Sequence, residues 1–546
     1  MRPNMSGFHR MLRTACTAVL PALAALSSAR GQGSPDSRQP VSLVVVITVD
    51  QMRGDYIARY ASQYTGGFAR IASHAALFPH GLQDHANTET APGHSTILSG
   101  REPTHTGIVS NDRGVPDPLA PLVGYPGPGA SPARFIGTTL VDWLHSADTN
   151  SRVLSVSRKD RGAILPVGRA KGSVYWWADG AFTTSRYYAD ALPAWVIKFN
   201  DRKSADALAG TTWDLLLPAS SYAEPDSMLF ENAGADVVFP HQLPKSPAEM
   251  RATLSRFPWM DSVTIAFALD GARTLQLGRR GATDVLAVSL STTDAVGHAF
   301  GPDSRELHDQ LLRLDRWLGY FLDSLARIVP AERTVFVLTG DHGVTSYPEY
   351  TAMVKHKPAG RVSLDGLTRE TAGALSDRFE MDFGFEFNGN GLMIADTAAM
   401  RARGLSVDSI ANALAARVRG GPGVATVYTP RTLASAPPVD VHAMRWRHAI
   451  PKDTPWLICT VLKPGFVWSS EKLSAEHGTM GDESVNVPIA FWGAGVVPHL
   501  FAERARTVDI APTLAAFLGV KPSETLDGRV LQGVFTNAAG AKAGSR

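Results

Sequence analysis

Cysteine is almost absent from this 546-residue sequence, which contains only Cys16 and Cys459. If an N-terminal segment that includes Cys16 is removed, the remaining chain forms no internal disulfide, and its fold depends on its hydrophobic core alone. Net charge is low as well: 19% of the residues are charged, and the formal net charge is +2. This balance gives no indication of a nucleic-acid-binding surface, so we expect no nucleic-acid partner.

The N-terminus has an apolar run, but a short one. It covers residues 15–26 (ACTAVLPALAAL), follows three arginines and precedes a Ser-Ser-Ala sequence. A basic segment, a short apolar run and a small-residue cleavage site predict a secretory signal peptide at residues 1–29, followed by a linker at residues 30–40. The run is too short to span a bilayer. We therefore expect a periplasmic or secreted protein with no stable membrane anchor.

Hydrophobic residues make up 44% of the chain and include four continuous apolar runs. These runs are typical of strands buried on both faces of a sheet, and they lie at residues 41–49, 285–290, 334–338 and 487–492. Leucines from Leu307 to Leu325 repeat at spacings of three and four, which predicts an amphipathic helix with Asp303 and Glu306 as a capping pair. A second helix is predicted at residues 507–518.

The alternation of strands and helices predicts a doubly wound α/β fold, with a mostly parallel central sheet and helices on both faces. Residues 112–280 and 345–475 are less regular and are rich in glycine, proline and aromatic residues. We expect them to be inserted segments that cap the sheet within a single catalytic domain at residues 41–546. Ligands of this fold usually bind beyond the carboxyl ends of the strands.

Aspartates and histidines stand beside the ends of all four predicted strands. They are Asp50 after the first strand, Asp294 and His298 after the second, Asp341 and His342 after the third, and His477 before the fourth. Any one of them, taken alone, is most often a turn or helix-cap residue. Because the strand ends converge on one edge of the sheet, the six together suit zinc, and their number suits two metal ions.

The segment HANTETAPGHST, residues 85–96, is too polar and too rich in turn-forming residues to be a long strand or helix. It offers the hydroxyl groups of Thr88, Thr90, Ser95 and Thr96 beside a Pro-Gly pair. Nearby metal ions would lower the pKa of one such hydroxyl, so that it could attack as a nucleophile. The chemistry of the residue types does not choose among the four.

Several segments, in this order, resemble the alkaline phosphatase superfamily of two-zinc phosphate-ester hydrolases: VDQMRGDY, TAPGHSTILSGREPTHTGIVSND, TTDAVGHAFGP, TGDHG and HGTMGDESVNVPIAFWG. The threonine followed by x-Pro-Gly-His is similar to the branch of phosphate-irrepressible bacterial alkaline phosphatases and nucleotide pyrophosphatase/phosphodiesterases. By this resemblance Thr90 is the nucleophile. The resemblance also implies two zinc ions, one held by Asp294, His298 and His477, the other by Asp50, Asp341 and His342 together with Thr90.

The segment SVSRKDRGAILPVG resembles the monoesterase branch. By that resemblance Lys159 and Arg161 contact the phosphoryl oxygens, as does Asn111 in GIVSND. A cationic pair and an amide donor suit the charge on the non-bridging oxygens of a transferred phosphoryl group. The implied protein is an alkaline phosphatase that hydrolyses small-molecule phosphate monoesters through a phospho-threonine intermediate. We expect it to act as a monomer.

Other functions fit the sequence less well. A phosphodiesterase or nucleotide pyrophosphatase of the same superfamily would keep Thr90 and the metals but would not need Lys159 and Arg161. A sulfatase would need Cys/Ser-x-Pro-x-Arg, which TAPGH does not provide, and a phosphoglycerate mutase would use serine and manganese without being exported. An exported solute-binding protein would share the signal peptide and the α/β pattern, but it would have no use for six metal ligands.

Overall fold

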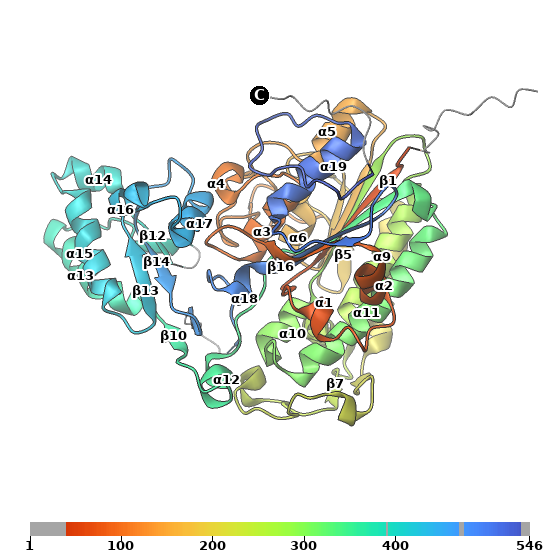
Figure 1. Cartoon of the computed structure of the whole chain (residues 1–546), viewed down its shortest axis with the longest axis horizontal. Coiled ribbons are helices and arrows are strands. Elements are labelled where there is room, and N and C mark those ends of the chain that lie inside the picture. The colour runs from red at the N-terminus through yellow and green to blue at the C-terminus, as the bar shows by residue number, and fades with distance from the viewer. Residues whose placement is uncertain (1–39, 389–390, 469–473, 537–546) are drawn as a thin grey trace, which may run out of the picture. The chain divides into compact units, whose positions relative to one another are not determined.

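The computed structural model describes residues 40–388, 391–468 and 474–536, so the predicted signal peptide and most of the predicted linker lie outside the described residues. Its main element is a nine-stranded sheet with the order β17-β2-β16-β9-β1-β8-β3-β4-β5 (Figure 1). The strands are β1 (Leu43–Val49), β2 (Ala76–Leu82), β3 (Val153–Ser157), β4 (Ser173–Ala178), β5 (Ala181–Thr183), β8 (Asp284–Leu290), β9 (Thr334–Gly340), β16 (Asn486–Gly493) and β17 (His499–Leu500).

Strand β1 lies at the centre of this sheet and is buried on both faces. Leu43, Val45 and Ile47 pack into one hydrophobic core, whereas Val44 and Val46 pack into the other. None of these five side chains is more than 2% exposed. The alternation follows from the two-residue period of a strand, and it explains why a continuous β-branched run forms the middle of the sheet.

Helices cover both faces of the sheet (Figure 1). One core contains α2 (Gly67–His74), α9 (Trp259–Thr274), α10 (Thr292–Phe300) and α11 (Arg305–Ala326). The other contains α3 (Thr90–Ile97), α5 (Leu140–Ala147), α6 (Asp160–Ile164) and α19 (Ile510–Leu518). Since β1, β3, β4, β8 and β9 pair in parallel, the predicted doubly wound, mostly parallel α/β fold is confirmed.

Helix α11 is the helix that the leucine spacing predicted, but its start differs. The N-cap is Ser304, whose Oγ accepts a hydrogen bond from the Leu307 N–H at 3.1 Å. The predicted capping pair is therefore wrong: Asp303 accepts a hydrogen bond from Ser346, and Glu306 pairs with His241 at 3.0 Å. A serine directly before the first helical residue reaches the third N–H of the helix, so it replaces a cap one residue earlier.

The expected insertion at residues 112–280 differs from a simple cap, because it contributes β3, β4 and β5 to the central sheet. These strands are short, and β3 (VLSVS) alternates apolar residues with serine, so no continuous apolar run marked it. The same segment also contains a small ladder of β6 (Thr212–Trp213) and β7 (His241–Gln242).

The other expected insertion, residues 345–475, builds a second sheet with its own core. The sheet has the order β11-β12-β14-β13, with bounds Glu386–Asn388, Leu392–Ile394, Trp456–Leu462 and Val424–Tyr428. Helices α13 (Leu364–Phe379), α14 (Thr397–Ala402) and α15 (Val407–Arg419) pack against it. Strands β10 (Gly360–Val362) and β15 (Phe466–Trp468) form a separate pair, and Cys459 in β14 is buried and free.

Short helices occupy the remaining connections: α1 (Tyr56–Arg59), α4 (Pro103–Thr106), α7 (Ala194–Asp201), α8 (Pro247–Thr253), α12 (Pro348–Met353), α16 (Pro430–Ser435), α17 (Val441–Ala449) and α18 (Asp482–Val485). The C-terminal helix predicted at residues 507–518 begins as a 3-10 turn at Thr507–Asp509 and continues as α19. Among the described residues, no helix is both long and apolar enough to cross a membrane.

One buried carboxylate of α11 bonds the start of α2. Asp315 in α11 accepts hydrogen bonds from the backbone N–H groups of Thr65, Gly66 and Phe68, each at 2.7 Å. These donors lie at the start of α2, where the first N–H groups have no partner within the helix. A Cβ on Gly66 would lie 2.2 Å from the Asp315 carbonyl oxygen, so glycine is required for this close approach.

We predict that Asp315→Ala lowers the free energy of unfolding by about 3–5 kcal/mol, because hydrogen bonds to a charged group contribute roughly 1.5–3 kcal/mol each and do not add fully. The matched control is Asp323→Ala, which removes the exposed Arg70–Asp323 ion pair between the same two helices. That control should cost no more than about 1 kcal/mol, the upper end for an exposed ion pair. Urea unfolding measures both, and equal losses would contradict the role assigned to Asp315.

Candidate metal centre

The predicted site residues meet at one edge of the central sheet. Val49, the last residue of β1, pairs with Leu290 of β8 on one side and with Gly340 of β9 on the other, so the three parallel strands end level with one another. The segments that follow carry Asp50, the start of α10, and Asp341 with His342. Strand β16 runs antiparallel to β9, so the segment that precedes it, with His477, arrives at this same edge.

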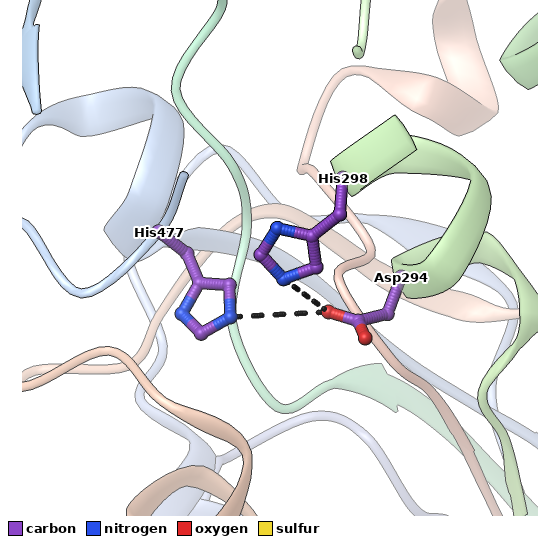
Figure 2. Close-up of side chains that lie close together, drawn as sticks. All are labelled: Asp294, His298 and His477. Carbon is purple, nitrogen blue, oxygen red and sulfur yellow. Dashed lines mark ion pairs between the residues drawn. The ribbon is translucent and has the colours of Figure 1, made fainter. Parts of the chain in front are cut away.

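The first group of side chains consists of Asp294, His298 and His477. Asp294 and His298 lie one turn apart on α10, with 3.3 Å between Asp294 Oδ1 and His298 Nε2. The distance from Asp294 Oδ1 to His477 Nε2 is 3.9 Å. Figure 2 shows the carboxylate and both imidazoles turned toward one another. One oxygen and two ring nitrogens therefore face a common point, as in a metal site.

A second group lies beside the first and is fully buried. Ligand atoms of Asp50, Asp294 and His342 all lie within 4.8 Å of one another, so Asp294 belongs to both groups. His342 Nε2 is 3.5 Å from Asp50 Oδ1 and 3.7 Å from Asp341 Oδ2. The structure thus brings all six predicted ligands together.

The three imidazoles share one orientation. The Nδ1 atoms of His298, His342 and His477 lie 2.7, 2.9 and 2.9 Å from the backbone carbonyl oxygens of Ala475, Gly343 and Thr88. A carbonyl oxygen only accepts hydrogen bonds, so each Nδ1 carries the proton, and each Nε2 of a neutral ring turns its lone pair to the cluster. A backbone partner that fixes the outer nitrogen is typical of metal-ligating histidines.

The buried carboxylates are only partly supplied with hydrogen bonds. Asp50 and Asp341 are fully buried, yet Asp50 Oδ1 has no hydrogen-bond partner, and Asp50 Oδ2 and Asp341 Oδ2 have ionic contacts alone, with Lys159 Nζ at 2.6 Å and His94 Nδ1 at 3.0 Å. Burial and the neighbouring Asp294 and Asp341 charges raise the pKa of Asp50 to about 6. Burial would also raise the pKa of Asp294, but Lys159, His298 and His477 hold it well below its usual value. Buried carboxylates with open oxygens fit a divalent cation, and with the imidazoles they form a donor set suited to zinc.

Lys159 supplies positive charge inside this cluster. Its Nζ lies 2.6 Å from Asp50 Oδ2 and 2.7 Å from Asp294 Oδ2. It also donates a hydrogen bond to the Thr90 hydroxyl at 3.1 Å. The predicted phosphate-contacting lysine and the predicted nucleophile are therefore direct neighbours.

Thr90 begins α3 and is the hydroxyl of its loop that faces the cluster. Its Oγ1 is 3.5 Å from His342 Nε2 and contacts Lys159. The other candidates donate to backbone carbonyls: Thr88 to Thr479, Ser95 to Pro92 and Thr96 to Gly93. The geometry thus separates four hydroxyls that residue type could not distinguish.

The other two predicted phosphate-contacting residues, Asn111 and Arg161, differ in how close they lie to Thr90. Asn111 Oδ1 accepts a hydrogen bond from the Ala91 N–H at 2.9 Å, next to Thr90. The backbone N–H of Asn111 donates to the Glu89 carboxylate at 2.7 Å. Among the described residues, the ion-pair partner of Arg161 in α6 is Asp160, at 3.6 Å, and its buried Nε has no hydrogen-bond partner there. The structure therefore places Asn111 beside Thr90 but does not bring Arg161 into contact with Thr90.

Two further residues of the cluster were missed by sequence reasoning. Gln51 donates hydrogen bonds to both Asp341 and Asp294. His94 Nδ1 lies 2.9 Å from the Thr90 carbonyl oxygen and 3.0 Å from Asp341 Oδ2. His94 stands in the motif TAPGH and Gln51 in the motif VDQMRGDY, so membership of these motifs is the signal that could have identified both.

Comparison with known proteins adds an independent line of evidence. Residues 44–466 match the family described as type I phosphodiesterase / nucleotide pyrophosphatase. The chain is 32% identical over 526 residues to alkaline phosphatase PhoK from a Sphingomonas species, which covers 90% of this chain and 91% of PhoK. It is 30% identical over 525 residues to alkaline phosphatase PhoV of Synechococcus elongatus, which covers 90% of this chain and 92% of PhoV.

A solved structure is similar over the same range. The crystal structure of wild-type alkaline phosphatase PafA, a protein of Elizabethkingia meningoseptica, matches with a TM-score of 0.85 and 27% sequence identity. The match covers 91% of this chain and 99% of the PafA chain. The similarity therefore includes both the central sheet and the segments inserted into it.

Proposed function

The chain belongs to the type I phosphodiesterase / nucleotide pyrophosphatase family, and on that basis we propose that it is an alkaline phosphatase that hydrolyses phosphate monoesters. The family expected from the sequence motifs is confirmed by the match over residues 44–466. PhoK, PhoV and PafA, all named alkaline phosphatases, support the activity because each aligns with 90% or 91% of the chain.

The main support for a monoesterase is the hydrogen bond from Lys159 Nζ to the Thr90 hydroxyl, at 3.1 Å. A phosphate monoester presents more negative charge on its non-bridging oxygens than a diester does, and a buried ammonium group beside the nucleophile suits that charge. Arg161 has a partly exposed side chain and Asp160 as its ion-pair partner, so its guanidinium is available to a second phosphoryl oxygen. Asn111, next to Ala91, provides an amide donor.

We propose that two zinc ions bind at this centre. Asp294, His298 and His477 would hold one, and Asp50, Asp341 and His342 the other, with Thr90 beside it. The three oriented imidazoles and the buried Asp50 Oδ1, which has no hydrogen-bond partner, support this proposal. When bound, zinc supplies Lewis-acid stabilisation of the nucleophile and of the leaving oxygen.

The proposed reaction has two steps. Thr90 Oγ1 gives up its proton and attacks the phosphorus in line with the leaving oxygen, so that an O–P bond to Thr90 forms as the bond to the leaving group breaks. The leaving oxygen takes up a proton from solvent and departs as the alcohol. A water molecule then hydrolyses the phospho-threonine, which releases phosphate and restores the hydroxyl. Lys159 neutralises charge on the transferred phosphoryl group in both steps. The hydrogen bond from the Ala91 N–H to Asn111 Oδ1 holds the Asn111 amide near that group.

A second candidate is a phosphodiesterase or nucleotide pyrophosphatase, because the family is named for those activities. Such an enzyme would use the same metals and Thr90 but would gain little from Lys159. We also propose that the protein is exported and acts as a monomer in the periplasm or outside the cell. The basic, apolar and small-residue sequence at residues 1–29 supports export.

Removal of metal should abolish activity. Exhaustive chelation at neutral pH should reduce phosphomonoesterase activity to background, and zinc should restore it, because neutral imidazoles and carboxylates release metal reversibly. Elemental analysis should find about two zinc ions per active chain. Full activity in chelated protein with less than about one zinc ion per chain would contradict the two-zinc proposal.

Replacement of the nucleophile should stop turnover without loss of the fold. Thr90→Ala should lower kcat by roughly 10³-fold or more, with zinc content unchanged, because only a small hydroxyl is lost. Thr90→Ser should retain appreciable activity, because serine also offers a hydroxyl. Steady-state kinetics would reject the assignment if Thr90→Ala turned over like wild type while Thr88→Ala did not.

Lys159→Ala and Arg161→Ala should each lower kcat/KM for a phosphate monoester by about 10²–10³-fold, because each removes a charged donor to the transferred group. A matched diester should lose only several-fold. Since Lys159 also contacts Asp50 and Asp294, zinc content is measured in parallel, so that a change in metal binding is recognised. Lys171→Ala, which removes an exposed lysine stacked on Tyr187, is the control. Equal losses on both substrates would assign the pair a structural role.

A further inference from the structure

Gln51 joins the two ligand groups of the metal centre. It directly follows Asp50, is fully buried and has a left-handed backbone with φ of 66°. Its backbone N–H donates to Asp341 Oδ1 at 3.0 Å, and its side-chain Nε2 donates to Asp294 Oδ1 at 3.1 Å. A residue other than glycine rarely adopts this conformation, and such backbones occur preferentially at functional sites.

The two hydrogen bonds control which carboxylate atoms face the cluster. Asp341 Oδ1 accepts from the N–H groups of both Gln51 and His342, each at 3.0 Å, so Oδ2 is the oxygen that remains turned to His342 Nε2. Asp294 Oδ1, the atom that faces His298 and His477, accepts the Gln51 amide on one lone pair. Gln51 therefore orients one ligand in each proposed zinc set.

Gly297 provides the space for this side chain. It lies in α10 between Asp294 and His298, and a Cβ built on it would lie only 1.8 Å from Gln51 Oε1. Glycine inside a helix is unfavourable relative to alanine, so a helical glycine calls for a packing reason. Close packing against Gln51 is that reason here.

We propose that Gln51 is a positioning residue that couples the two metal sites, and that Gly297 is required to admit its amide. The proposal rests on the proposed use of two zinc ions and goes beyond it, because Gln51 is neither a ligand nor a group that touches substrate. By holding Asp341 through its backbone and Asp294 through its side chain, Gln51 fixes the spacing of the two carboxylates before metal binds.

The test measures zinc affinity of the full chain by competition with a chromophoric chelator. Gln51→Ala removes the amide but keeps the backbone N–H, so zinc binding should weaken about 10- to 100-fold, the usual effect of losing a partner that orients a ligand. The control is Gln63→Ala, which removes a different glutamine that donates to the Ser221 carbonyl at 2.8 Å, away from the cluster. Gln51→Met, which keeps the side-chain volume, replaces Gln51→Ala if the latter does not fold.

A double-mutant cycle tests the role of Gly297. In the wild-type background, Gly297→Ala should displace the Gln51 amide and weaken zinc binding about as much as Gln51→Ala does. In the Gln51→Ala background, Gly297→Ala should have little effect on zinc binding, because the Gln51 Oε1 with which the new Cβ would clash is absent. Additive losses, or zinc affinity in Gln51→Ala equal to that of Gln63→Ala, would overturn the proposal. Wild-type protein that binds no zinc would instead overturn the proposed metal centre itself, so the two failures are distinguishable.

Discussion

The burial of three carboxylates at one edge of a sheet is the constraint on which the rest of this structure depends. Asp50, Asp294 and Asp341 are each at most 5% exposed, and their negative charges repel one another at short range. Such a cluster is stable only with positive charge among its oxygens. Lys159 provides one positive charge. Divalent cations, bound by the three oriented imidazoles together with the carboxylates, would provide further positive charge.

The fold meets this constraint with its backbone. Parallel strands β1, β8 and β9 end level with one another, so residues more than 200 positions apart in sequence become neighbours. Antiparallel β16 delivers His477 to the same edge from the opposite direction. Backbone carbonyls set the imidazole tautomers, and the start of α3 presents Thr90. The chemistry therefore depends on secondary-structure ends, which are rigid, more than on long loops.

Much of this arrangement could be predicted from sequence, because continuous apolar runs mark buried strands and their flanking residues must share an edge. The positions of the six proposed ligands belong to that predictable part. Thr90 does not, on chemistry alone, because only the fold shows that its hydroxyl meets Lys159 and His342 whereas that of Thr88 donates to a backbone carbonyl. Strand β3 was missed because serines interrupt its apolar pattern, and Ser304 was missed because a cap depends on a one-residue register. Gln51 lies in the motif VDQMRGDY, but the role that we propose for it could not be predicted, because it depends on a left-handed φ and on contacts to residues 243 and 290 positions away.

The buried ammonium of Lys159 beside Thr90 is the feature that we propose makes this centre selective for the more highly charged ester. The most direct measurement compares kcat/KM of the wild-type enzyme for an aryl phosphate monoester and for the matching diester, at equal leaving-group pKa and with zinc saturating. We expect a preference for the monoester of about 10²-fold or more, the usual contribution of one charged donor to a transition state. A wild-type preference for the diester would contradict it and would identify the protein as a phosphodiesterase.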